Sequence, residues 1–394
     1  MTNTPANAKR TVGWMGIHRG HKARPAEWLA EKCIYLVSLT AILMVFLIFV
    51  FVAREALPLV LGQMNSAAAR PALSTQDFDN LKPEEQRLYL ELTPAEFKRM
   101  DKEALLALVE VRQEEAKEAP KDKDAKVNTT EWRYLFGAHE WSDSRPEDRY
   151  VWQPIGRIHK YNLWPLIIGS LKTTLVALLF SVPLALAAAI YVSQLSSPSL
   201  KEWLKPAIEL LSGVPSVVLG FFGLIVMATF LQGTFGYQSR LNAFVAGIAL
   251  GLAVIPVVFS IAEDALTSVP RSYTQAALAL GSSRWQAAWQ VVLPAALPGV
   301  FAAVMLGFGR AIGETMVVLM ASGNASIMSW SLFDSTRTIT ATLAAEMGET
   351  VFGGAHYRVL FLIGSLLFVV TFLSNLIADI VIHRLKNKLE GKTR

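Results

Sequence analysis

Six long runs of apolar residues, separated by polar segments, dominate this sequence. A helix needs about 20 mostly apolar residues to cross the hydrocarbon core of a bilayer. Six runs are long enough, and they are Cys33–Ala53, Leu166–Tyr191, Leu210–Leu231, Ala243–Ala262, Ala295–Met320 and Val359–Val381. The pattern predicts an all-α integral membrane protein with six transmembrane helices.

Lysine and arginine residues gather beside the first and the last run. They are Lys9, Arg10, Arg19, Lys22, Arg24 and Lys32 before the first run, and Arg384, Lys386, Lys388, Lys392 and Arg394 after the last. Cytoplasmic flanks carry such an excess of basic residues, so both termini are predicted to be cytoplasmic, which agrees with an even number of spans. Residues 1–32 are then a cytoplasmic segment, 33–53 the first span, interpreted as a retained signal anchor, and 386–394 a basic tail.

A long polar segment, residues 54–165, follows the first span and is predicted to be extracytoplasmic. Charges of both signs crowd its residues 66–130. Thr93-Pro-Ala-Glu96 is a capping box that predicts a helix over Phe97–Ala119, after a shorter helix over Leu81–Leu92. We expect a helical hairpin, followed by a solvated tether at 121–126. The insertion is either a charged spacer or a docking surface for a solute-binding protein.

Composition agrees with a membrane protein and narrows its chemistry. Apolar residues make up 53% of the 394 residues and charged residues 18%, with a mean hydropathy of +0.37. Cys33 is the sole cysteine, which excludes an intrachain disulfide and a cysteine-based zinc site. The sequence lacks a P-loop, so ATP chemistry would have to come from a partner. The net charge is +5, and the basic residues gather at the ends of the apolar runs. This distribution indicates orientation in a membrane rather than nucleic-acid binding.

The segment between the fourth and fifth runs predicts a polar helix-turn-helix. Gln275-Ala-Ala-Leu-Ala-Leu-Gly281 is followed after nine residues by Val291-Val-Leu-Pro294. Ala276 and Ala277 offer a small-residue surface to a partner, and Gly281 permits a sharp turn. Pro294 is suited to open the next helix.

This spacing resembles the EAA coupling loop of ABC-importer permeases, which the resemblance implies docks into a cytoplasmic ATPase subunit. Gln275 stands where that family usually has Glu, so one charge contact of the docking helix is absent. The resemblance assigns ATPase coupling to one set of residues, namely Gln275, Ala276, Ala277, Gly281, Leu293 and Pro294.

Arg310 and Glu314 are charged residues inside the fifth apolar run. Charge within a bilayer costs about 3 kcal/mol or more, so such residues face a protein interior or a wet pathway. Their i,i+4 spacing predicts one helix face and mutual neutralisation. A guanidinium donates two parallel hydrogen bonds to an oxyanion. The pair is therefore either a substrate site or a buried ion pair that fixes helix packing.

The carboxylate sharpens the substrate hypothesis. Phosphate near neutral pH still carries a proton that it can donate to Glu314, whereas sulfate carries none and would be repelled. The pair therefore favours a protonated oxyanion.

Other polar positions carry weaker signals. A metal site or, more simply, a solvated loop is expected at Glu346, Glu349 and His356. A helix-helix hydrogen-bonding pair is expected at Asn375 and Asp379. Glu263 and Asp264 mark the end of the fourth run and suggest no special role. We find no Ser-His-Asp set or metal-binding helix motif in the sequence, and expect no catalysis by this chain.

The combination resembles the phosphate-specific transport branch of ABC permeases, and its PstC-type subunit in particular. The matching pieces are Ser181–Tyr191, Gly213–Gly220, the coupling loop, Gly309–Thr315 and Thr336–Glu346, within residues 131–385. The resemblance implies a MetI-like core over 166–385, with the coupling loop at 263–294 and a substrate pathway at Arg310, Glu314 and Thr315.

The same resemblance implies the partners. They are a second, PstA-like permease, two PstB-like ATPase subunits that bind ATP and magnesium, a PstS-like phosphate-binding protein, and inorganic phosphate, in a bacterial inner membrane. The charged block at 66–130 departs from the compact loop of that family. Two alternatives stay open: a sulfate or molybdate permease of the same architecture, and a channel or ion-driven secondary transporter.

Overall fold

The computed structural model describes residues 25–64, 73–90, 92–118, 124, 127–142, 145, 148–156 and 158–389. The chain divides into two compact units, Met1–Phe51 and Val52–Arg394. Helix α1 begins in the first unit and ends in the second. The predicted cytoplasmic segment before residue 25 and the end of the basic tail lie outside the described residues.

Among the described residues, six helices are long and apolar enough to cross a membrane, as the sequence predicted. They are Trp28–Val60, Trp164–Leu195, Ser216–Phe235, Ala243–Thr267, Arg284–Gly313 and Ala355–Asn387. The spanning part of α1 (Pro25–Val60) is longer than the predicted 33–53 and keeps most of its apolar side chains exposed. A helix that is apolar all round is suited to lipid.

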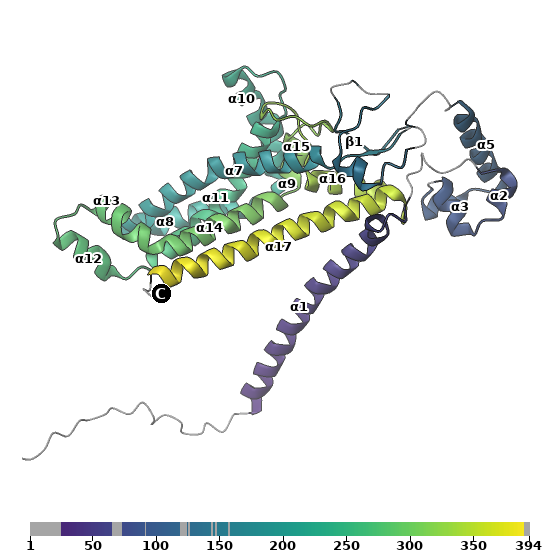
Figure 1. Ribbon diagram of the computed structural model, residues 1–394. Helices are drawn as coiled ribbons and strands as arrows, with labels where there is room; N and C mark the ends of the chain where they lie inside the picture. The colour runs from purple at the N-terminus through teal and green to yellow at the C-terminus, as the bar shows by residue number, and fades with distance from the viewer. Residues whose placement is uncertain are drawn as a thin grey trace, which may run out of the picture. The chain divides into compact units, whose positions relative to one another are not determined.

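The second unit is built around a bundle of long helices that run alongside one another (Figure 1). Its helices are α7 (Trp164–Ile190), α11 (Ala243–Thr267), α14 (Leu293–Gly313) and α17 (Ala355–Leu389). The third span consists of α9 (Ser216–Phe222), the π-helical turn η5 (Gly223–Met227) and α10 (Ala228–Phe235), and the fifth span begins with α13 (Arg284–Ala287). The other short helices are α8 (Pro198–Glu209), α12 (Arg271–Ala279), α15 (Met316–Ala321) and α16 (Ile339–Glu346). Below, the two ends of the bundle are called the α12 end and the α16 end.

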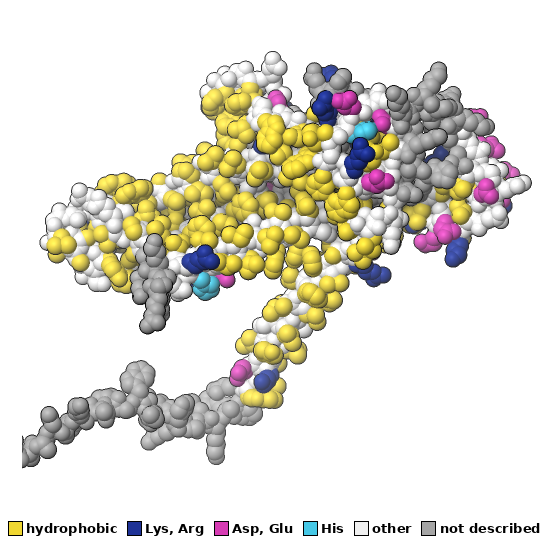
Figure 2. Space-filling model, viewed as in Figure 1, with side chains coloured by type: hydrophobic (Ala, Val, Ile, Leu, Met, Phe, Trp, Pro, Cys, Tyr) yellow, Lys and Arg dark blue, Asp and Glu magenta, His cyan; other side chains and the backbone are white. Residues whose placement is uncertain are grey.

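Small residues set the spacing of the bundle. A Cβ added to Gly247 of α11 would lie 2.5 Å from Val176 of α7, and one added to Gly307 of α14 would lie 2.5 Å from Val258. Helices in membranes pack closely through such residues, because lipid gives no hydrophobic drive for association. On the face drawn in Figure 2, hydrophobic side chains cover this bundle, as expected where lipid or another subunit surrounds it.

Two predicted spans are interrupted. The third, predicted over 210–231, begins only at Ser216, because the 3₁₀ turn η4 (Leu210–Gly213) ends in an extended Val214–Pro215 link. The fifth, predicted to reach Met320, ends at Gly313, since Glu314 has an extended backbone and α15 starts anew at Met316. Thr340 donates its hydroxyl to the Glu314 carbonyl at 2.8 Å and stabilises this break.

The insertion differs from the predicted hairpin of two helices. Its described residues form four helices, which are α2 (Thr75–Asp79), α3 (Pro83–Leu90), α4 (Pro94–Arg99) and α5 (Lys102–Glu118). The Thr93–Glu96 capping box is present. The helix predicted over 97–119 is split because Met100 is extended and the Asp101 carboxylate accepts from the Ala104 N–H at 2.9 Å, which caps a second helix.

A small core and one arginine hold the insertion in place. Phe78, Tyr89 and Val109 form its buried cluster. Arg87 is buried and donates to the carbonyl of Phe352, which precedes α17, at 3.0 Å. The predicted solvated tether lies outside the described residues except for Asp124, which is buried and accepts from Ser142 N–H at 2.8 Å.

A buried charge cluster joins the segments at the α16 end. Glu346 contacts Arg337 at 2.9 Å and His356 at 3.3 Å, and it accepts a hydrogen bond from the Trp152 indole at 3.2 Å. Trp152 lies in β1 (Trp152–Gln153), which pairs antiparallel with β2 (Lys160–Tyr161) after the short helix α6 (Trp132–Phe136). The expected solvated loop is therefore wrong for the buried Glu346 and the half-buried His356, whereas Glu349 is exposed as expected.

We predict that Gly247→Ala lowers the stability of the protein by about 1–3 kcal/mol, because the methyl group overpacks the α7–α11 contact. Gly233→Ala is the matched control, since a Cβ there meets nothing within 4 Å. Thermal unfolding of the detergent-solubilised protein, followed by size-exclusion chromatography, measures both. Equal midpoints for the two variants would contradict the packing argument.

Candidate substrate site and coupling loop

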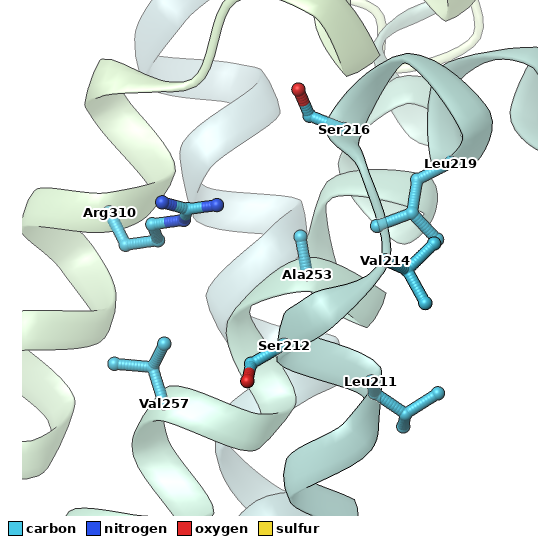
Figure 3. Close-up of a pocket in the computed structure, with 8 residues that line it drawn as sticks. All are labelled: Leu211, Ser212, Val214, Ser216, Leu219, Ala253, Val257 and Arg310. Carbon is cyan, nitrogen blue, oxygen red and sulfur yellow. The ribbon is translucent and has the colours of Figure 1, made fainter.

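Arg310 lies in the last turn of α14 and faces a cavity of about 100 Å³. Figure 3 shows its guanidinium reaching into the space between η4, α9 and α11. The other lining residues are Leu211, Ser212, Val214, Ser216, Leu219, Ala253 and Val257. The extended Val214–Pro215 link separates η4 from α9 on this wall. The volume suits a small anion better than a larger organic ligand, which needs several hundred Å³.

Glu314 follows Arg310 at the break after α14, so the two do not share a helix face as predicted. Their side chains still meet, with Arg310 Nη2 3.5 Å from Glu314 Oε2. This contact is longer than the 2.7–2.9 Å of a tight charged hydrogen bond. Glu314 is nearly buried, with 8% of its side chain exposed, while 52% of the Arg310 side chain is exposed. The guanidinium therefore keeps donors available for a ligand.

Hydroxyl groups surround the carboxylate side of the pair. Glu314 lines a second, very small pocket of about 10 Å³, together with Ser170, Thr173, Thr174, Thr338 and Thr340. This space suffices for about one water molecule. Arg310 thus faces a cavity lined mostly by apolar residues, whereas Glu314 lies beside a set of hydroxyl-bearing residues.

Thr315 also belongs to the break. Its N–H donates to the Glu314 carboxylate at 3.2 Å, and its hydroxyl lies 3.5 Å from the Gly313 carbonyl. Thr315 therefore orients the carboxylate through its backbone, and a direct role in the substrate pathway stays a prediction.

The coupling loop has the predicted helix-turn-helix geometry. α12 ends at Ala279, Gly281 turns the chain with a φ of +88°, and α13 begins at Arg284. Gln275 and Ala276 are exposed, whereas Ala277 is 7% exposed and packs within the chain. The surface open to a partner is thus Gln275 and Ala276 rather than both alanines.

Pro294 lies in the first turn of α14, as predicted, but the residues before it are helical too. The chain is already helical from Arg284, and the π-helical turn η6 (Ala288–Val292) runs directly into α14. A proline lacks the N–H for the regular helical bond, and a wider turn before it accommodates that loss. Leu293 is half-buried beside it and packs against the core of the bundle.

Sequence reasoning missed several side chains. Tyr273 and Leu280 expose 52% and 88% of their surface on the coupling loop. Lys172 is buried in α7 and donates to the carbonyls of Ser329 and Ser331 at 2.7 and 2.9 Å. A single lysine inside an otherwise uncharged apolar run was the signal that could have identified it.

Two of the weaker expectations are resolved by geometry. Asp379 is exposed and lies 3.8 Å from His383 rather than bonding to Asn375. Glu263, for which no special role was expected, is 1% exposed and paired with two lysines of α8. Among the described residues, no group of three or more His, Cys, Asp or Glu side chains is placed to hold a metal ion.

Comparison with known proteins explains this arrangement. Residues 181–389 match the family described as the binding-protein-dependent transport system inner membrane component. The chain belongs to that family. It is a multi-pass inner-membrane permease subunit of an ABC importer.

The permease has similar relatives in several bacteria. A probable ABC transporter permease protein of Bacillus subtilis, YqgH, is 38% identical over 56% of this chain and 72% of its own length. The phosphate transport system permease protein PstC of Mesorhizobium japonicum is 35% identical over 59% and 76%, and that of Xylella fastidiosa is 33% identical over 60% and 78%. A chain of the MetNI methionine ABC transporter aligns with 57% of the permease and 97% of its own length, at 19% identity and a TM-score of 0.44.

We predict that Gly281→Val weakens capture of the ATPase subunit while leaving the permease in the membrane. A Cβ added at residue 281 meets nothing within 4 Å, so the substitution acts only through the positive φ. This backbone conformation costs a β-branched residue about 1–3 kcal/mol. Gly281→Asn is the control, because asparagine tolerates this conformation. Pull-down of the ATPase with the tagged permease measures both variants. Undiminished capture by the valine variant would show that the turn does not contribute to docking.

Proposed function

We propose that this permease imports inorganic phosphate as the PstC-type subunit of a phosphate-specific transport system. The observation that carries the proposal is the pair at the end of α14, where a half-exposed Arg310 faces a small cavity and a nearly buried Glu314 lies beside it. Its relatives in Mesorhizobium japonicum and Xylella fastidiosa are named as phosphate transport permeases, which supports the same substrate.

The two side chains have separate roles in this proposal. Arg310 binds the oxyanion, because a planar guanidinium donates two parallel hydrogen bonds and stays charged at any relevant pH. Glu314 accepts the proton that phosphate still carries near neutral pH. Sulfate carries no such proton, so the carboxylate repels it and selects for phosphate. Thr315 holds the carboxylate in place through its N–H.

The permease works with other subunits. A PstA-like permease completes the pathway opposite the exposed side of Arg310, because a charged side chain of this kind is costly against lipid. Two PstB-like ATPase subunits bind ATP and magnesium and dock on Gln275, Ala276 and Gly281 at the α12 end. A PstS-like phosphate-binding protein delivers phosphate at the α16 end.

Transport proceeds by alternating access. Closure of the ATPases on ATP is transmitted through the coupling loop and opens the pathway outward, and hydrolysis resets it. Both termini and the α12 end lie in the cytoplasm in this arrangement. This chain supplies the pathway and no catalytic step.

We expect Arg310→Lys to reduce phosphate uptake at least about tenfold, because an ammonium cannot reproduce the two-pronged contact, and one charged hydrogen bond is worth about 1.5 kcal/mol or more. Uptake is measured in vesicles reconstituted with all subunits. Arg240→Lys is the control, since Arg240 contacts Thr229 at 3.3 Å, outside the cavity. Equal uptake by the two variants would mean that Arg310 only fixes helix packing.

Glu314→Gln tests selectivity. The neutral amide no longer repels a fully ionised anion, so sulfate should compete with phosphate more strongly, even if phosphate uptake also falls. The assay uses a background that hydrolyses ATP without the binding protein, because that protein is itself a selectivity filter. The exposed Glu202→Gln is the control. A wild-type complex that already takes up sulfate as readily as phosphate would favour the sulfate alternative.

A further inference from the structure

Glu263 is a fully buried carboxylate at the α12 end, and both of its oxygens are occupied. Oε1 lies 2.6 Å from Lys201 Nζ and Oε2 lies 2.7 Å from Lys205 Nζ. Thr267, one turn further along α11, donates its hydroxyl to Oε1 at 2.7 Å. The hydrogen bonds that Lys205 makes with Asp264 and Glu263 raise the pKa of this lysine, so it stays charged. The cluster is thus a complete charge clamp.

The clamp supplies the ion pairs that attach α8 to α11, beside one hydrogen bond from the Ser260 hydroxyl to Glu209 at 3.1 Å. This helix carries no buried residue, and Leu204 and Ile208 are only partly buried against the bundle. The neighbouring Trp203 exposes 81% of its surface. The two lysines therefore hold an otherwise lightly packed helix to the end of α11.

The clamp joins two elements that the proposed mechanism must connect. α8 continues directly into η4, whose Leu211 and Ser212 line the Arg310 cavity. On the other side, α11 ends four residues after Glu263, and α12 of the coupling loop begins at Arg271. The clamp therefore ties the end of α11 that precedes the coupling loop to the helix that leads into the η4 side of the cavity wall.

Fold stability alone is a poor reason for such a clamp. Apolar residues of similar volume commonly stabilise a buried site as well as an ion pair does, since the pair must first lose its water. Two lysines of α8 that bind one carboxylate of α11 do, however, fix the relative orientation and register of these two helices.

We propose that Glu263 is a positioning residue, which passes displacement of the coupling loop to the wall of the Arg310 cavity by holding α8 to α11. The proposal rests on the proposed import of phosphate by this permease. With the clamp intact, α8, η4 and the end of α11 move as one body. Without it, the coupling loop and α11 move while the η4 side of the cavity wall stays behind.

The test is the ratio of phosphate imported to ATP hydrolysed by the complete complex in vesicles. For Glu263→Gln we expect this ratio to fall about tenfold, the size of effect that residues along a coupled network produce. ATP hydrolysis should continue, because the docking surface of the coupling loop is unchanged. A residue that served stability alone would lower both rates together and leave the ratio unaltered.

Asp264→Asn is the matched control. It makes the same chemical change one position along, at a side chain that is 67% exposed and contacts Lys205 alone of the two lysines. Its ratio should stay near that of the wild type. The quadruple variant Glu263→Lys, Asp264→Lys, Lys201→Glu, Lys205→Glu reverses every charge of the cluster and should recover part of the ratio.

Single lysine variants keep the proposal testable if the Glu263→Gln complex does not assemble. Lys201→Gln and Lys205→Gln each leave Glu263 one lysine, and each should lower the ratio about threefold. Normal ratios in every variant that assembles would overturn the proposal. A wild-type complex that hydrolyses ATP but imports no phosphate would instead overturn the proposed function.

Discussion

Every charged group within the helical bundle needs a protein partner or a wet surface, because lipid offers neither. Three such groups meet this need differently. Lys172 is satisfied by two backbone carbonyls, and Glu263 by two lysines. Arg310 has a long contact with Glu314 and remains half-exposed. The first two arrangements are closed by partners within the protein, whereas the third is open and leaves room for a ligand.

The open arrangement depends on interruptions of the helices. In a regular helix through residue 320 the Glu314 carbonyl would be bonded within the helix. The bond from Thr340 stabilises the break instead, and Glu314 lines a small pocket together with Ser170, Thr173 and Thr174. On the opposite wall the extended Val214–Pro215 link lets η4 and α9 line the cavity. Two local departures from regular structure thus shape one site.

Length and hydropathy sufficed to predict the six spans and the membrane class, because a spanning helix is a local property of the chain. The charged pair was also recognisable, since charge within an apolar run is conspicuous. The helix break at Glu314 was not, because it depends on Thr340, which is 26 residues away. The partners of Glu263 and Glu346 were missed for the same reason, as they come from distant segments. The cap at Asp101 was also missed. Its signal is local, because an aspartate before Lys-Glu-Ala is an ordinary helix N-cap.

The anchoring of the insertion has an evolutionary consequence. Arg87 bonds to the carbonyl oxygens of Leu92 and Phe352, not to side chains. A main-chain oxygen is present whatever residue occupies the position, so mutations can accumulate in the turn before α17 without disturbing this contact. The arginine itself has no such freedom. An accessory module fixed in this way can be gained or remodelled with few compensating changes in the permease that carries it.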